Sequence, residues 1–233
     1  MNIVHATGIV GAQSARGVVV VIDVLRSFTV SAYALAGGAR ECLLVTTVDQ
    51  ARALAKEVGG AVVCAEEDAL PVEGIAISNS PTQIGATDLK GRTLIQRSTA
   101  GTPVLAAVRG AEAMFAGSLV VASATAQACL LRQPSTVTLV ASADFPEDHA
   151  CAKYLEALLG GLEVDPNELE SWLEPLRQSE RYRRVMAGRW PGFPATDIEL
   201  SLHPDRFDFS MPASRRDGFL RVTRESQQDR ELA

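Results

Sequence analysis

The run V-V-V-V-I at residues 18–22 constrains the fold of this chain more than any other segment. It leads directly into Asp23, and Arg26 and Ser27 follow just beyond. A run of β-branched residues this dense predicts a strand buried on both faces, as in a parallel sheet. Unpaired charges are costly away from water, and ligands of open α/β sheets bind at the carboxyl ends of the strands. We therefore expect this strand to deliver Asp23, Arg26 and Ser27 to a site. The alternative is that Asp23 caps the next helix and Arg26 lies on the surface.

Strand and helix patterns alternate along most of the chain. Further apolar runs predict strands at residues 41–45, 61–64, 93–96 and 136–141, and another within 113–122. Helical patterns separate them at residues 31–36, 49–58, 103–108 and 123–131, and one more begins near residue 147. This alternation predicts an α/β fold with a mostly parallel sheet and helices on both faces. Residues 1–17 are weakly patterned and can add an edge strand.

The character of the chain changes after Asp165. Residues 166–190 carry many charges and predict one or two amphipathic helices. We expect a single domain over residues 1–233, in which residues 166–213 form a helical C-terminal cover. The polar tail after Ser214 is expected to be frayed.

Composition excludes several classes of protein. The net charge of −6 argues against a general nucleic-acid binder, although a local pocket can still be positive. No run approaches the ~18 apolar residues of a membrane helix, and no signal-peptide pattern opens the sequence. We therefore expect a soluble cytoplasmic protein without a membrane or nucleic-acid partner. The four cysteines and three histidines form no zinc-binding spacing. The oligomeric state, a homodimer included, is left open.

Acidic residues follow several of the predicted strands. They are Asp23 after the first strand, Glu66 and Glu67 after the third, and Asp144, Glu147 and Asp148 after the last. In a parallel sheet these ends lie at one edge, where gathered carboxylates repel one another unless a cation neutralises them. Hard oxygen ligands of this kind suit Mg²⁺. Each acid also has a simpler interpretation, since residues 66–68 can form a solvated loop and two acids in a first helical turn favour the helix dipole.

The segment R-S-T-A-G-T at residues 97–102 lies between a predicted strand and a predicted helix. It offers hydroxyls, backbone N–H groups and a glycine for close approach, and so it predicts an anion-binding loop. An ordinary helix cap by Ser98 and Thr99 is the simpler alternative. Carboxylates for a metal beside an anion-binding loop are typical of phosphoryl transfer. The P-loop, the cysteine-phosphatase loop, the paired Asp-x-Asp, the dinucleotide G-x-G-x-x-G and the hydrolase elbow are all absent from the sequence.

At this point the sequence resembles the 2-phosphosulfolactate phosphatases, a family of Mg²⁺-dependent enzymes associated with coenzyme M biosynthesis. The matching segments are, in chain order, I-D-V-L-R-S (22–27), A-E-E (65–67), S-N-S-P (78–81), G-R-T-L-I-Q-R-S-T-A-G-T (91–102), G-S-L-V (117–120), P-E-D-H-A-C-A (146–152) and a region ending in D-R-F-D-F (197–209). Each segment is short, but their order and spacing extend over nearly the whole chain.

The resemblance implies a three-layer α/β/α sandwich and hydrolysis of a phosphate monoester on a small, acid-bearing molecule. The metal-site candidates that it implies are Asp23, Glu66, Glu147 and Asp148. The candidates for holding phosphate or substrate are Arg26, Ser27, Asn79, Arg97, Ser98, Thr99, Gly101 and Thr102. Among these, Asp23, Arg26 and Ser27 are the residues we expect to act in catalysis.

This chain departs from the family pattern at three places. Glu67 stands where the pattern has Arg, Ala100 replaces an Asn, and an Asn expected near Val121 is missing. Arg97 stands where the pattern has Thr and can compensate for the lost cation. We therefore predict a Mg²⁺-dependent phosphatase for 2-phosphosulfolactate or a related substrate. One alternative is a family member without catalysis that binds a small anionic metabolite. A further alternative is a scaffold subunit that assembles through residues 166–190.

Overall fold

The computed structural model describes residues 1–216 and 218–226 of the chain. Its main sheet has ten strands in the order β1-β8-β2-β7-β10-β11-β3-β6-β4-β5. The strands of this sheet are β1 (Asn2–Thr7), β2 (Arg16–Ile22), β3 (Glu41–Val45), β4 (Val62–Glu67), β5 (Leu70–Pro71), β6 (Thr93–Arg97), β7 (Gly110–Gly117), β8 (Thr136–Ala141), β10 (Pro212–Arg216) and β11 (Phe219–Val222). Two short strands, β9 (Phe209–Ser210) and β12 (Glu225–Ser226), pair separately.

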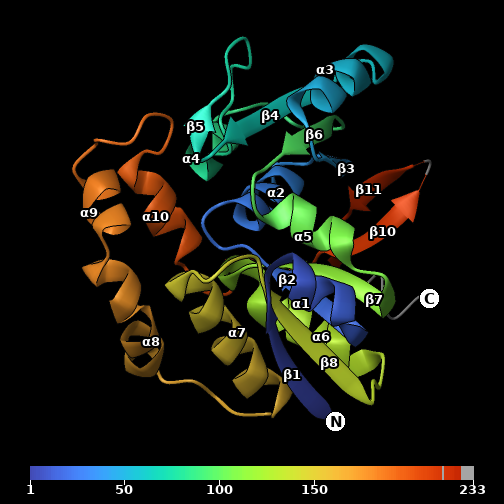
Figure 1. Cartoon of the computed structure of the whole chain (residues 1–233), viewed down its shortest axis with the longest axis vertical. Helices are drawn as coiled ribbons and strands as arrows, with labels where there is room; N and C mark the ends of the chain where they lie inside the picture. The colour runs from blue at the N-terminus through green and yellow to red at the C-terminus, as the bar shows by residue number, and fades with distance from the viewer. Residues whose placement is uncertain (217, 227–233) are drawn as a thin grey trace.

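Helices cover both faces of this sheet (Figure 1). They are α1 (Gly8–Ser14), α2 (Ser27–Ala36), α3 (Val48–Glu57), α4 (Pro81–Gly85), α5 (Gly101–Ala107), α6 (Ala122–Leu131), α7 (Pro146–Leu159), α8 (Pro166–Gln178), α9 (Glu180–Met186) and α10 (Ala195–Ser201), with a 3₁₀ turn at Leu119–Val121. The predicted α/β sandwich with a mostly parallel sheet is confirmed, and β1 is the edge strand that residues 1–17 were expected to add.

The side chains of β2 divide between the two faces of the sheet. Val19 and Val21 pack in a core with α1, α2 and α5, whereas Val18, Val20 and Ile22 pack in a second core with α6, α7 and α8. All five side chains are buried. Because β2 pairs in parallel with both β7 and β8, its valine-rich sequence matches a position with helices above and below.

The segment from residue 209 onward differs from the prediction. Residues 166–190 contain two helices, α8 and α9, as expected, and α10 follows them, but residues 209–213 form β9 and begin β10. Of the described residues after Ser214, residues 215–216, 219–222 and 225–226 are paired in strands rather than frayed. The hairpin β10–β11 joins antiparallel to β7 on one side and to β3 on the other. Residue 217 and residues 227–233 lie outside the described residues.

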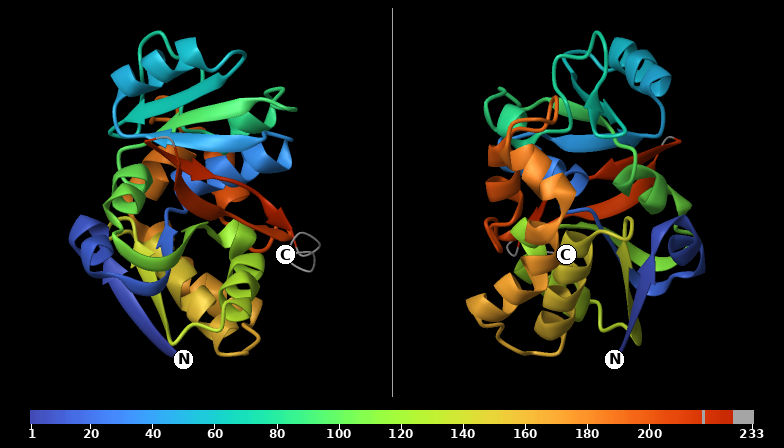
Figure 2. Two further views of the ribbon diagram at one scale, coloured as in Figure 1. Left: turned by 90° about the vertical axis from the view of Figure 1, so that its right-hand side faces the viewer. Right: turned by 60° about the vertical axis from the view of Figure 1, so that its left-hand side comes forward.

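The hairpin links two parallel groups of strands into one sheet. Figure 2 shows it in red, crossing between β3, β6 and β4 at the top and β1, β2, β7 and β8 at the bottom. Sequence alternation could not reveal this arrangement, because each hairpin strand pairs with a segment about a hundred or more residues away along the chain. The covering helices α8, α9 and α10 follow one side of the molecule, and α8 packs against α7 (Figure 1).

Candidate active site

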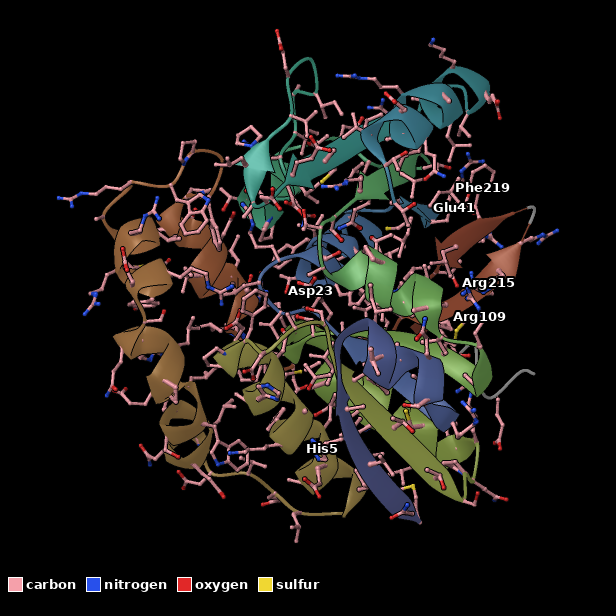
Figure 3. All side chains as sticks on the ribbon, in the orientation of Figure 1. His5, Asp23, Glu41, Arg109, Arg215 and Phe219 are labelled. Atoms are coloured by element: carbon pink, nitrogen blue, oxygen red, sulfur yellow. The ribbon has the colours of Figure 1, made fainter. Side chains whose placement is uncertain are left out.

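A cavity of about 300 Å³ opens at the carboxyl ends of β2, β4 and β6. Its polar lining comes from the residues that follow these strands, including Asp23, Arg26, Glu66, Ser98 and Thr99. Asp23 lies near the centre of the molecule (Figure 3). The prediction that these strand ends converge is therefore confirmed for three of the strands, as expected where ligands bind to open α/β sheets.

Asp23 connects the end of β2 to the start of two helices. Its Oδ1 accepts a hydrogen bond from Ser27 N at 2.9 Å, and its Oδ2 accepts one from Gly101 N at 2.8 Å. Burial raises the pKa of Asp23 to about 6, and the negative charges of Glu66 and Glu147 add to the shift. Asp23 thus bonds the first residue of α2, as expected of a helix cap, and it also lines the cavity, as expected of a site residue.

Gly101 allows the close approach that this arrangement needs. A Cβ atom at Gly101 would lie 2.6 Å from Asp23 Oδ2 and 3.1 Å from Asp23 Cγ. Asp23 cannot move away without breaking its bond to Ser27 N. The glycine is therefore required by the carboxylate and not by an unusual backbone angle.

Replacing Gly101 by Ala is expected to displace Asp23 and to lower catalytic turnover by about 100-fold, the order of loss for a misplacement of about 1 Å. Overpacking is also expected to lower the free energy of unfolding by about 1–3 kcal/mol. Steady-state kinetics and urea unfolding measure the two effects. The control is Gly85→Ala in α4, where an added Cβ meets nothing within 4 Å. Equal behaviour of the two variants would contradict this role of Gly101.

Glu66 is held by the two loops that flank the cavity. Its carboxylate accepts hydrogen bonds from Thr99 N, from Thr99 Oγ1 at 3.0 Å and from Ala69 N at 2.6 Å. Trp190 Nε1 donates to Ala69 O at 3.1 Å, so the indole ring is fixed against the same loop. The carboxylate is buried, and its position is set by both β4 and the segment after β6.

The other two predicted metal ligands are occupied elsewhere. Asp148 accepts from Val24 N at 2.8 Å and from Ser142 N and Oγ at 3.1 and 2.7 Å, which ties α7 to β2 and β8. Glu147 Oε1 pairs with Arg181, while its buried Oε2 has no partner in the described part of the chain. Burial raises the pKa of both carboxyls, and the charges of Asp23 and Glu147 raise that of Asp148 further.

No group of three or more His, Cys, Asp and Glu residues within residues 1–216 and 218–226 is placed to hold a metal ion. The four carboxylates Asp23, Glu66, Glu147 and Asp148 are thus not assembled into one ligand cluster. Asp23 and Glu66 are the two of them that line the cavity. A pair of carboxylates fits Mg²⁺, which commonly binds to one or two carboxylates and completes its shell with waters and substrate phosphate.

The segment 98–102 binds the protein's own acids. The N–H of Thr99 donates to Glu66 and that of Gly101 to Asp23. The N–H of Thr102 donates to Ser98 Oγ at 3.1 Å, and Ser98 Oγ donates to Thr102 Oγ1 at 3.0 Å. These backbone groups therefore position carboxylates, which differs from the expected open cradle for a substrate anion. Ser98 and Thr99 still line the cavity.

A buried polar network supports this segment from below. Gln96 Nε2 donates to Ser27 O at 2.7 Å and to Asn79 Oδ1 at 2.9 Å. Ser27 Oγ donates to Ser98 Oγ at 3.0 Å. The structure thus brings the predicted residues Ser27, Asn79 and Ser98 together, and Asn79 also reaches the cavity. Gln96 was not predicted as part of the site.

Arg26 is a buried cation at the cavity and not a surface charge. Its Nη1 donates to Asp197 Oδ2 at 2.9 Å and to Gly192 O at 2.6 Å, and its guanidinium lies 3.9 Å from the centre of the Phe193 ring. Its buried Nη2 has no hydrogen-bond partner within residues 1–216 and 218–226. Because an unpartnered cationic donor is costly, this atom indicates a place for an anion.

Asp197 fixes the orientation of Arg26. Its second oxygen accepts from Ser80 Oγ at 2.7 Å and from Thr82 N at 3.1 Å, and its side chain is fully buried. The sequence marked Asp197 only as the start of a matching segment, and nothing in its spacing identified Arg26 as its partner. The sequence does not show that Asp197 is buried, because the charged residues near it are mostly exposed.

Arg97 is not among the residues that line the cavity, and its expected role as a compensating cation stays a prediction. Its guanidinium bonds Glu66 O and Thr99 Oγ1, and it lies 3.9 Å from Glu67. Side chains alternate along β6, and Gln96 takes the buried direction. Arg97 therefore braces the outside of the loop that carries Glu66.

The far wall of the cavity comes from residues that the sequence analysis did not select. Arg181 from α9 and the rings of Phe145, Trp190 and Phe193 line it. Arg181 lies 4.4 Å from the centre of the Phe145 ring. Aromatic and charged residues have many roles on protein surfaces. Only their packing against the strand ends therefore identifies these residues as part of the cavity.

Comparisons with known proteins show the family of this chain. The family model of 2-phosphosulpholactate phosphatase matches residues 5–187. A probable 2-phosphosulfolactate phosphatase of Bacillus subtilis is 32% identical over 195 residues, which cover 82% of this chain and 85% of the relative. Probable 2-phosphosulfolactate phosphatases of Carboxydothermus hydrogenoformans and of a Synechococcus species are 38% and 30% identical, over 60% and 80% of this chain and 60% and 77% of the relatives.

By family, the chain is a phosphoric monoester hydrolase, and its α/β fold with acids and a cation at the strand ends agrees with that class. It belongs to the 2-phosphosulpholactate phosphatase family, as the matching segments indicated. The match covers Asp23, Arg26, Glu66 and the segment 98–102, whereas Asp197 lies beyond it.

Proposed function

We propose that this chain is a Mg²⁺-dependent phosphatase that hydrolyses a small acidic phosphate monoester, 2-phosphosulfolactate or a related compound, to the alcohol and phosphate. The observation that carries the proposal is one cavity in which Asp23 and Glu66 lie with the buried, partly unpartnered guanidinium of Arg26. Phosphoryl transfer requires acidic side chains that hold a metal cation and a cationic side chain that binds the phosphate. The names of the relatives support the substrate.

In this proposal each side chain has a distinct task. Asp23 and Glu66 hold Mg²⁺, which when bound neutralises phosphate charge and polarises the attacking water. Arg26 Nη2 donates to a phosphate oxygen, and Asp197 keeps its guanidinium in place. The hydroxyls of Ser98 and Thr99 offer further donors. The rings of Trp190 and Phe193 lower the local dielectric, which strengthens these electrostatic contacts.

Purified chain is expected to release inorganic phosphate from 2-phosphosulfolactate in the presence of Mg²⁺ and to lose this activity when the metal is removed by EDTA. Restoring Mg²⁺ should restore the release. A colorimetric phosphate assay over a panel of small phosphate monoesters measures the effect. Release that is unchanged by EDTA would contradict the Mg²⁺ dependence, and no release from any member of the panel would contradict the phosphatase function.

A second candidate is a family member that binds a small anionic metabolite without hydrolysing it. Ala100, which replaces an Asn of the family pattern, lines the cavity, and Glu67 adds an acid close to Arg97. Calorimetric binding of 2-phosphosulfolactate without phosphate release would favour this candidate.

We also propose that the chain acts in the cytoplasm on a small molecule, without nucleic acid. The described residues contain no helix with the length and apolar character needed to span a membrane.

A further inference from the structure

Two arginines line the cavity, and they come from different parts of the chain. Arg26 follows β2, whereas Arg181 lies on α9 of the covering segment. Each guanidinium lies over an aromatic ring, Arg26 over Phe193 and Arg181 over Phe145. This stacking holds each planar cation in a fixed place, because the ring face attracts positive charge. The cavity therefore offers two separate anchoring points for anionic groups.

The two arginines differ in how they are held. Arg26 is almost fully buried and braced by Asp197, so it has little freedom. Arg181 is one-fifth exposed, and within the described residues its guanidinium donates a side-chain hydrogen bond only to Glu147. An arginine carries five N–H donors in a planar fork. The remaining donors of Arg181 are therefore available to a ligand in the cavity.

We propose that Arg181 is a specificity-determining residue that binds an acid group of the substrate, a carboxylate or a sulfonate, while Arg26 binds the phosphate. This assignment rests on the proposed phosphatase function. Arg97 does not line the cavity and is engaged by the loop that carries Glu66. Arg181 thus supplies the second cation that a phosphate monoester with an additional acid group requires.

Glu147 positions Arg181 for this task. Its buried carboxylate bonds one nitrogen of the guanidinium, and its second oxygen has no partner among the described residues. A planar fork held at one edge presents its other edge in a defined direction, which is how arginine recognises carboxylates with two parallel bonds. The neighbouring apolar rings exclude water from this contact and favour a charge-assisted bond.

Arg181→Gln is expected to lower kcat/KM for 2-phosphosulfolactate by about 10- to 100-fold, mainly through KM, because a charge-assisted hydrogen bond contributes about 1.5–3 kcal/mol. The same variant should change kcat/KM for isopropyl phosphate, which lacks both acid groups, by less than about 3-fold. 2-Phospholactate, which keeps the carboxylate and lacks the sulfonate, shows which acid Arg181 binds. Equal effects on all three compounds, or none, would overturn the proposal.

Two variants control for charge and fold. Arg183→Gln makes the same change at an exposed position of the same helix and should leave all three substrates unaffected. Arg181→Lys keeps the charge but loses the planar fork, so it should recover part of the discrimination. An effect of Arg183→Gln equal to that of Arg181→Gln would show a general charge effect and overturn the assignment.

A binding measurement separates this proposal from the phosphatase function. Calorimetry with sulfolactate, which carries the acid groups without phosphate, should show binding to the unmodified chain that weakens about 10- to 100-fold in Arg181→Gln. Binding of inorganic phosphate should change by less than about 3-fold. If no monoester is hydrolysed but Arg181→Gln still binds sulfolactate more weakly than the unmodified chain does, the proposed phosphatase function is wrong and the role of Arg181 stands. If sulfolactate does not bind, or binds both proteins equally, the role of Arg181 fails.

Discussion

Asp23→Asn is expected to abolish Mg²⁺-dependent phosphate release, with a fall in kcat of about 10³-fold or more. The change removes the charge that we propose to hold the metal, and a metal ion contributes several kcal/mol to a transition state of this kind. The size of the side chain stays the same, and an amide oxygen can still accept one of the two backbone N–H bonds that Asp23 now accepts. The chain should therefore remain folded by circular dichroism. Phosphate release at saturating substrate measures the loss.

Asp68→Asn provides the matched control. Asp68 also lines the cavity, but it is exposed, and its backbone has a φ of 51°, a left-handed conformation that Asn adopts readily. This variant should retain kcat within about 3-fold. Turnover by Asp23→Asn at the level of the unmodified chain would remove Asp23 from the mechanism. Equal losses in the two variants would indicate a general effect of negative charge in the cavity.

Asp197→Asn is expected to cause the largest loss of stability among the substitutions considered, about 3–5 kcal/mol in the free energy of unfolding. Removing one partner of a buried ion pair leaves an uncompensated charge, here the guanidinium of Arg26. The same change frees Arg26 from its fixed orientation, so KM for the phosphate monoester should rise. Urea unfolding and steady-state kinetics measure the two effects.

A double variant tests whether the two residues act as a pair. Arg26→Gln/Asp197→Asn removes both charges, so it should be more stable than Asp197→Asn alone, but it should be inactive because it lacks the guanidinium that binds phosphate. Glu170→Gln, which breaks the exposed ion pair with Arg177, should cost less than about 1 kcal/mol. The pairing would be contradicted if the double variant lost as much free energy of unfolding as Arg26→Gln and Asp197→Asn lose together.

The sequence was informative where local pattern and sheet geometry coincide. The valine-rich run of β2 could occupy only a doubly covered strand, and the carboxyl-end rule then brought Asp23, Glu66 and Ser98 to one cavity. The sequence could not show that Arg97 bonds the loop of Glu66 instead of lining the cavity, because side chains alternate along a strand and neighbouring residues point to opposite faces. Asp197 and Arg181 were missed because their roles depend on how the covering helices pack, which no short-range pattern encodes.

The C-terminal hairpin was missed for a related reason. The segment P-A-S-R-R of β10 contains too few apolar residues to predict a strand in the middle of a sheet, and F-L-R-V of β11 is apolar but only four residues long. Each of the two strands also pairs with a distant strand, β10 with β7 and β11 with β3. Pairing between segments this far apart in the sequence is set by the whole topology and not by local propensity.

The position of this hairpin has a consequence for the order in which the molecule can assemble. Asp23 belongs to the group of strands around β2, whereas Glu66 and Ser98 belong to the group around β6, and residues 212–222 connect the two groups within the sheet. Both groups are synthesised before the hairpin that pairs with them. Closure of the sheet is therefore a late, long-range event that we expect to limit the folding rate. Catalytic competence and the final cooperative step of folding should consequently appear together.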